Sequence, residues 1–142
     1  MKTVKHVLDA KGRNVWSIDA GAAVLDGIKQ MAEKKVGALM VKDGEKVAGI
    51  VTERDYARKV ILKGRSSRET QIKEIMTPRV VYVGPEATVE ECMALMTNKE
   101  IRHLPVMDDG ELAGMLSIRD LLTAIIGDQQ YTIEQLERYI TH

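Results

Sequence analysis

Two short segments of this chain pair a hydroxyl residue with an aspartate three positions later. The first reads GIVTERD at 49–55 and the second reads GMLSIRD at 114–120. Where a strand passes into a helix, free backbone N–H groups and the helix dipole favour an anion such as phosphate. A carboxylate one turn further on can accept hydrogen bonds from the paired hydroxyls of a ribose. The glycine that opens each segment would let a flat ring approach the backbone. Together these parts suit a nucleoside phosphate.

The same residues also have a purely structural interpretation. Thr52 with Asp55, and Ser117 with Asp120, are good helix caps, because the hydroxyl satisfies backbone donors and an acidic residue is favourable in a first turn. A duplication copies caps as well as binding sites. The residues alone therefore leave both interpretations open.

A repeat contains both segments. A shift of 65 positions aligns residues 15–61 with residues 80–126 without a gap. Each copy predicts the order strand, helix, strand, strand, helix. The first strands are expected at 15–18 and 80–83, followed by apolar residues at helical spacing around Met31 and Met96. Each copy then has two apolar runs separated by a turn containing Asp-Gly, which is typical of a hairpin.

The predicted fold class is α+β, with two tandem β-α-β-β-α repeats packed sheet to sheet about a pseudo-two-fold axis. We expect a first repeat with its N-terminal segment at 1–64, a linker and entry segment at 65–79, and a second repeat at 80–127. Capping-box spacing at Thr132 predicts a separate amphipathic helix over 128–142. Its apolar stripe, Ile133, Leu136 and Ile140, must pack either on this chain or on a second copy.

Composition excludes several classes of protein. The 142 residues carry 21 Lys+Arg and 21 Asp+Glu, which argues against a general positive field for binding nucleic acid. No apolar stretch approaches the ~20 residues of a membrane helix, and the start lacks the apolar core of a secretory signal. The single cysteine, Cys92, cannot form an internal disulfide. We therefore expect a cytoplasmic protein.

The repeat resembles the cystathionine β-synthase (CBS) domain. The order of elements ending in Gly-h-h-Thr/Ser-x-x-Asp, with h apolar, carries the resemblance over nearly all of residues 1–130. HLPV at 103–106 and IMTP at 75–78 also fit the family's strand and entry patterns. The chain is similar to a stand-alone tandem pair, also called a Bateman module. This resemblance implies a sensor in which adenosine-containing ligands, such as AMP, ATP, NAD or S-adenosylmethionine, bind clefts between the two repeats.

The resemblance also assigns roles to individual residues. The motif aspartates, Asp55 and Asp120, are expected to hold ribose, with the motif hydroxyls near ribose or phosphate. Arg102 and His103 resemble a phosphate-binding pair, although a solvent-facing arginine and a packed histidine are equally open. The first copy has Gly37 and Ala38 there, which would leave room for adenine. The expected ligand-binding set is Gly37, Ala38, Thr52, Arg54, Asp55, Thr77, Arg102, His103, Ser117, Arg119 and Asp120.

Three functions follow in order of preference. The first is a regulatory module that binds AMP, ATP or NAD, forms a homodimer and signals to an unidentified protein. The second is a dimerisation scaffold with no ligand. The third, an enzyme, lacks a recognisable acid–base or nucleophile–base arrangement. We therefore expect no catalytic residue, no catalytic cofactor, no metal, and neither nucleic acid nor membrane as a partner.

Overall fold

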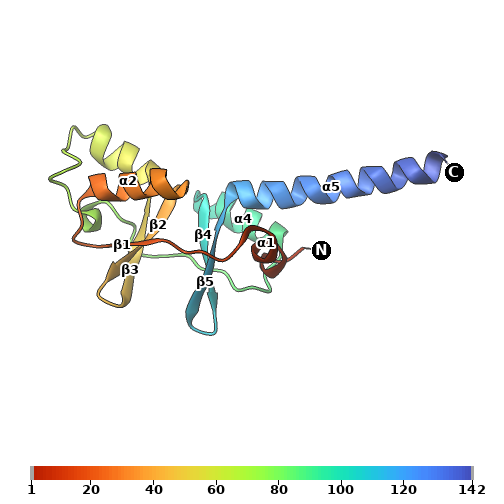
Figure 1. The fold of residues 1–142 in the computed structure, drawn as a ribbon, viewed down its shortest axis with the longest axis horizontal. Coiled ribbons are helices and arrows are strands. Elements are labelled where there is room, and N and C mark those ends of the chain that lie inside the picture. Colours follow the sequence, from red (N-terminus) through yellow and green to blue (C-terminus); the bar gives the residue numbers. More distant parts are fainter. Residues whose placement is uncertain (1, 142) are drawn as a thin grey trace. The chain divides into compact units, whose positions relative to one another are not determined.

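The computed structural model describes residues 2–141 of the chain, and the side chains of residues 2–140. These residues form a mixed α+β structure of two compact units. Residues 15–80 form one unit, and the N-terminal segment up to Asn14 joins the chain from Val81 onward in the other. The expected fold class, two tandem α+β repeats, is confirmed (Figure 1).

The unit of residues 15–80 is built on a three-stranded sheet in the order β1-β2-β3. Its strands are β1 (Ser17–Asp19), β2 (Ala38–Asp43) and β3 (Lys46–Thr52), with β1 parallel and β3 antiparallel to β2. Its helices are α2 (Val24–Lys34), α3 (Glu53–Tyr56), a π-helical continuation (Ala57–Ile61) and a 3₁₀ turn (Ile72–Glu74). Val24 and Met31, on one face of α2, are buried in one cluster with Leu39 and Val41 of β2.

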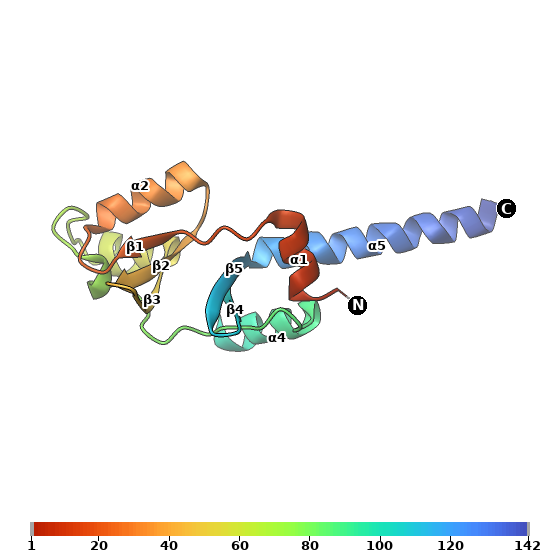
Figure 2. The ribbon, with the colours of Figure 1, turned by 60° about the horizontal axis from the view of Figure 1, so that its bottom comes forward.

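The other unit repeats this plan around a two-stranded sheet. It contains β4 (His103–Asp108), β5 (Glu111–Ser117), α4 (Val89–Lys99), α5 (Ile118–Thr141) and the N-terminal helix α1 (Val4–Lys11). Leu104 and Val106 of β4 share a buried cluster with Cys92 of α4 and Leu121 of α5. Helix α1 packs on α5 in this unit, as Figure 2 shows.

The duplication extends to irregular backbone features. Both hairpins have a register shift at equivalent places, between Val41 and Lys42 and between Val106 and Met107. Helices α2 and α4 both end on a left-handed residue, Lys35 with φ 57° and Glu100 with φ 55°. Because these features recur 65 positions apart, the two copies share one backbone design and not only an apolar pattern.

Each unit is completed by the segment that precedes the other copy. Thr3 forms an isolated antiparallel bridge with Thr88, at the start of α4. In the other unit, Gln71 forms the same bridge with Ala23, at the start of α2. The sequence repeat therefore differs from the spatial unit, because residues 1–14, expected to lie with the first copy, pack with the second.

Two elements expected from the sequence are corrected by the structure. The strand expected at 80–83 is reduced to an isolated parallel bridge between Val83 and Val106. The helix start expected at Thr132 is wrong, because α5 runs unbroken over 24 residues from Ile118. The Thr132 hydroxyl donates to the Asp128 carbonyl, 3.0 Å away and one turn back, so it lies inside a helix rather than capping one.

Candidate functional site

The first strand-to-helix junction forms where β3 ends at Thr52. The Thr52 Oγ1 accepts from the Asp55 backbone N–H at 3.1 Å. In return, Asp55 Oδ2 accepts from the Thr52 backbone N–H at 3.0 Å and from its hydroxyl at 3.2 Å. This reciprocal capping box satisfies donors that the first turn of a helix leaves open. The sequence Thr-x-x-Asp therefore folds locally into a cap.

The second junction has the same geometry where β5 ends at Ser117. The Ser117 backbone N–H donates to Asp120 Oδ2 at 2.7 Å, and the Asp120 N–H donates to Ser117 Oγ at 3.2 Å. The Asp120 side chain is 20% exposed and that of Asp55 is 14% exposed. The capping interpretation of both motifs is thus confirmed, and each carboxylate still reaches the surface.

A lysine neutralises each motif aspartate. Lys59 Nζ lies 3.1 Å from Asp55 Oδ1 and donates to the Ile75 carbonyl at 2.9 Å. Lys11 Nζ lies 2.7 Å from Asp120 Oδ2 and also donates to the Met115 carbonyl at 2.7 Å. Lys59 is one helical turn from its aspartate, whereas Lys11 comes from α1, 109 residues away. The two junctions are therefore electrostatically alike but are built from different parts of the chain.

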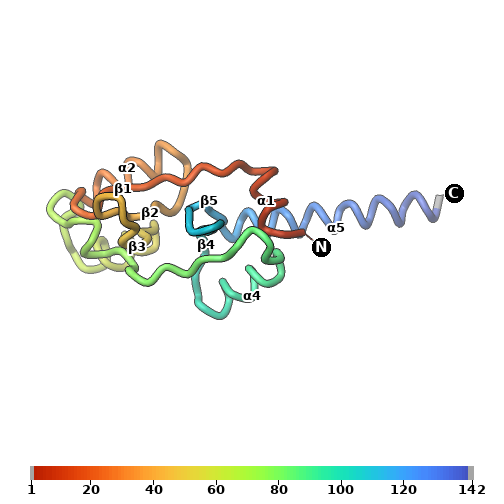
Figure 3. The backbone as a smooth tube through the Cα atoms, turned by 90° about the horizontal axis from the view of Figure 1, so that it is seen from below, coloured from red at the N-terminus to blue at the C-terminus, as the bar shows by residue number. Residues whose placement is uncertain are grey.

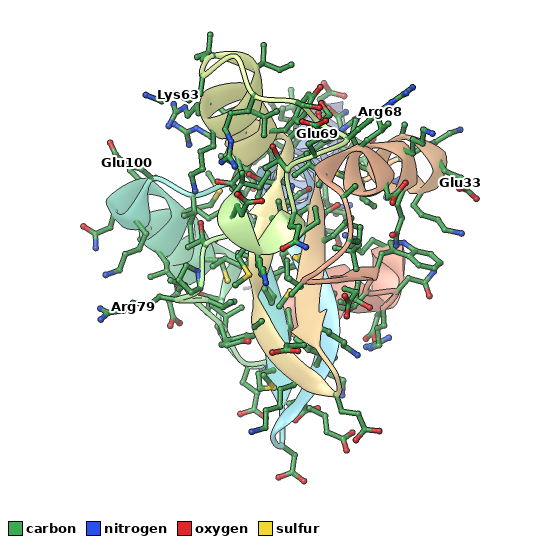
Figure 4. The ribbon with its side chains drawn as sticks, turned by 90° about the vertical axis from the view of Figure 1, so that its left-hand side faces the viewer. Glu33, Lys63, Arg68, Glu69, Arg79 and Glu100 are labelled. Carbon is green, nitrogen blue, oxygen red and sulfur yellow. The ribbon has the colours of Figure 1, made fainter. Side chains whose placement is uncertain are left out.

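Sequence analysis did not identify these two lysines as site residues. Lys59 belongs to a run of basic residues typical of a solvated helix face and linker, namely Arg58, Lys59, Lys63, Arg65 and Arg68, although its i,i+4 spacing from Asp55 could have indicated the pair. Lys11 carries no signal in the sequence, because nothing local places α1 beside α5. Elsewhere in this run, Lys63 and Arg68 are exposed and point outward (Figure 4), whereas Arg65 pairs with Glu74.

The structure places each of the two predicted pairs, Gly37 with Ala38 and Arg102 with His103, next to the hydroxyl of the motif in the same copy. Ala38 is the cross-strand partner of Thr52, and His103 is that of Ser117. The residues just before them accept from the first turn of the helix. The Glu53 N–H donates to the Gly37 carbonyl at 3.1 Å, and the Ile118 N–H donates to the Arg102 carbonyl at 2.8 Å. Each junction is thus one continuous patch of strand ends and helix start.

Arg102 and His103 differ in what they offer. Arg102 is exposed and His103 is half-buried. Burial lowers the pKa of His103, and nearby Lys11 and Arg102 lower it further, while Asp120 partly opposes them. His103 is therefore a neutral imidazole at pH 7, able to donate or accept one hydrogen bond, and the fixed positive charge of the pair belongs to Arg102.

Thr77 lies at the outer edge of β3. Its N–H donates to the Ile50 carbonyl at 2.8 Å and its carbonyl accepts from the Ile50 N–H at 3.0 Å. The two remaining candidates, Arg54 and Arg119, lie exposed in the first turns of α3 and α5.

The expectation that the motif glycines admit a flat ligand ring is wrong. A Cβ on Gly49 would lie 2.5 Å from the Thr77 carbonyl oxygen, and one on Gly114 would lie 2.7 Å from a methyl of Leu8. The chain itself occupies the space above both glycines. Because these glycines have no side chain, the segment that precedes the opposite copy can pack directly against them.

Other chemistry is limited among the described residues. Within residues 2–141, no three His, Cys, Asp or Glu side chains gather in a way that could hold a metal ion. In the same range, none of the helices has the length and apolar character needed to cross a bilayer. Cys92 is buried, and desolvation raises the pKa of its thiol to about 11, so it packs as a small apolar residue.

Comparison with known proteins decides the family. A sequence model described as the CBS domain matches residues 4–62 and again residues 72–127. The chain belongs to the CBS-domain family. It is 40% identical over 97% of its length to the CBS domain-containing protein CBSX3, mitochondrial, of Arabidopsis thaliana, and covers 71% of that protein.

Solved CBS structures resemble the fold over most of this chain. A putative signal-transduction protein with CBS domains from Burkholderia ambifaria is 53% identical, with a TM-score of 0.87 over 90% of this chain and 96% of that one. A hexameric CBS-CP12 protein from bloom-forming cyanobacteria is 33% identical, with a TM-score of 0.77 over 86% of this chain and 70% of its own. CBS domains are generally regulatory modules that bind nucleotides, and stand-alone CBS proteins are typically non-catalytic.

Proposed function

We propose that this protein is a regulatory module that binds an adenosine nucleotide (AMP, ATP or NAD) and transmits its bound state to a partner protein. The observation that carries this proposal is the junction at Ser117, where a partly exposed carboxylate, a helix N-terminus and an exposed arginine lie together. The carboxylate suits the ribose of a nucleotide, and the helix start and the arginine suit its phosphate. Family membership supports the same ligand class.

Each group of the junction has a defined task. The hydrogen bonds from Ser117 and Lys11 both end on Asp120 Oδ2, which leaves Oδ1 for a ribose hydroxyl. The Ser117 hydroxyl can donate to phosphate beside the positive end of the α5 dipole, and Arg102 adds a planar fork of donors with a fixed charge. A cationic sulfonium such as that of S-adenosylmethionine is disfavoured, because Arg102 and Lys11 are positive.

The two junctions are predicted to differ in affinity. Asp55 uses Oδ2 for its cap and Oδ1 for Lys59, whereas the bonds of Asp120 fall on Oδ2. The first junction also has Gly37 in place of Arg102 and so lacks that fixed charge. We therefore expect a phosphate-bearing ligand to bind more tightly at the Asp120 junction than at the Asp55 junction.

A second candidate function is a scaffold that assembles without ligand. The capping bonds favour it, because both aspartates already have a structural role. The hexameric cyanobacterial relative is consistent with assembly in this family. A homodimer and a cytoplasmic location belong to both proposals as predictions.

Calorimetric titration and thermal shift with AMP, ATP and NAD test the proposal. Ligands that bind the native state raise its melting temperature. Asp120→Asn keeps an oxygen that can accept from Ser117 but removes the charge, so we expect about a tenfold or greater loss of affinity. Its loss of stability should not exceed the roughly 1–2 kcal/mol expected for the ion pair with Lys11. Asp55→Asn is the matched control at the other junction. If none of the three nucleotides binds at millimolar concentration, the nucleotide proposal is refuted and the scaffold function is favoured.

A further inference from the structure

Helix α5 carries two apolar stripes, and only one is used inside its unit. Leu121 is fully buried, and Ile125 packs partly buried against the same cluster. At 100° per residue, the stripe of Leu122, Ile126, Ile133, Leu136 and Ile140 lies about a quarter-turn away. These five side chains are 43%, 62%, 48%, 58% and 80% exposed, respectively. We refer to these five residues with Gln129 as the outer seam.

The outer seam follows a heptad repeat. Ile126, Ile133 and Ile140 recur every seven residues, and so do Leu122, Gln129 and Leu136. With isoleucine assigned to position a, leucine and the single glutamine occupy position d. This combination, β-branched at a and leucine at d, favours two parallel strands in a coiled coil. The pattern spans residues 122–140, about 27 Å of helix.

The exposed length of α5 and the charges beside the outer seam are compatible with pairing between the α5 helices of two copies of this chain. The second half of α5 extends beyond α1 and α4 of its own unit (Figure 3), and its seam residues Ile133, Leu136 and Ile140 are exposed. Positions e and g beside the seam hold Thr123, Ile125, Gln130, Thr132, Glu137 and Tyr139. In a parallel pair the one charge, Glu137, faces Thr132 of the other copy. No like charges are therefore brought together.

The area of the seam is sufficient for a specific but modest contact. Covering the five exposed aliphatic side chains removes on the order of 500 Å² per chain, or about 1,000 Å² for a pair, near the lower limit of specific interfaces. The buried residues would be aliphatic over most of that surface, as in self-associating proteins. We propose that the outer seam binds the same seam of a second copy of this chain, as a parallel two-stranded coiled coil.

Cross-linking tests this arrangement independently of ligand binding. In a parallel, in-register pair, Gln129 at d faces its own copy, so Gln129→Cys brings two thiols within disulfide range. Gln135→Cys is the matched control, because it lies on the same exposed helix but about 140° from the centre of the seam. The wild type, whose Cys92 is buried, sets the background.

Under mild oxidation we expect about tenfold more disulfide-linked dimer from Gln129→Cys than from Gln135→Cys. Adding Ile133→Lys to Gln129→Cys should return cross-linking to the control level, since a charge at position a opposes the pair. Equal cross-linking of the two cysteine variants, or cross-linking that survives Ile133→Lys, would overturn the coiled coil. Either result leaves the nucleotide proposal unaffected, because the seam shares no residue with the Asp120 junction.

Discussion

Replacing Lys11 with methionine tests whether the lysine from α1 is a structural part of the Asp120 junction. Methionine keeps the unbranched apolar stem but removes the ammonium group. The variant loses a 2.7 Å ion pair to Asp120 and a 2.7 Å hydrogen bond to the Met115 carbonyl. The two charged side chains are 35% and 20% exposed, so solvent screens the pair only in part.

The expected cost lies between that of a surface ion pair and that of a buried one. Exposed pairs contribute about 0–1 kcal/mol, and a hydrogen bond to a charged group about 1.5–3 kcal/mol. We therefore expect Lys11→Met to lower the free energy of unfolding by about 1–2 kcal/mol, or the melting temperature by about 3–8 °C. Lys59→Met, at the first junction, should cost less because Lys59 is 44% exposed.

Calorimetry and urea unfolding measure these differences. Lys5→Met, an exposed lysine on the same helix, is the control and should change stability by less than about 0.5 kcal/mol. A double-mutant cycle of Lys11→Met with Asp120→Asn isolates the pair, with a coupling energy of about 1 kcal/mol expected. A coupling near zero, or a loss equal to that of Lys5→Met, would refute the reasoning.

Three further predictions follow from the same structure. Gly49→Ala places a methyl against the backbone carbonyl of Thr77 and should lower the free energy of unfolding by about 2–4 kcal/mol. Gly114→Ala places its methyl against the flexible side-chain end of Leu8 and should cost less, and the midpoints of urea unfolding compare the two variants. Burial lowers the pKa of His103 below its ordinary value of 6.5, so the folded protein loses stability as the pH falls through that range and the unfolded chain binds the proton more tightly. We therefore expect the melting temperature of His103→Asn to fall less between pH 7 and pH 5 than that of the wild type. The Cys92 thiol, with a pKa of about 11, should react with a thiol reagent at pH 8 only in urea, and rapid labelling of the native protein would contradict its burial.

The repeated unit could be predicted because its signals are local. Alternating and helical apolar patterns and the Asp-Gly turns at Gly44 and Gly110 each depend on residues a few positions apart. The structure confirms both hairpins, α2 and α4. It also confirms that each Thr/Ser-x-x-Asp motif is a cap at a strand-to-helix junction.

Local signals failed where neighbouring segments decided the outcome. The residues around Val83 have strong strand propensity, but they pair with β4 only through an isolated bridge. Thr132 has the spacing of a cap, but no residue before it breaks the helix that begins at Ile118. In both cases a propensity of about 1 kcal/mol or less was outweighed by the surrounding structure.

By itself, the sequence determined the duplicated α+β unit, the family, and the identity of the hydroxyls and carboxylates at both junctions. These properties depend on residue types at short spacing, which tertiary packing does not change. Only the tertiary structure decided that α1 completes the unit of the second copy and brings Lys11 to Asp120, 109 residues away. It also decided that the space above Gly49 and Gly114 is filled by the chain itself. Such contacts join distant segments through complementary shape and charge, and no local pattern of residues encodes which distant segment will lie there.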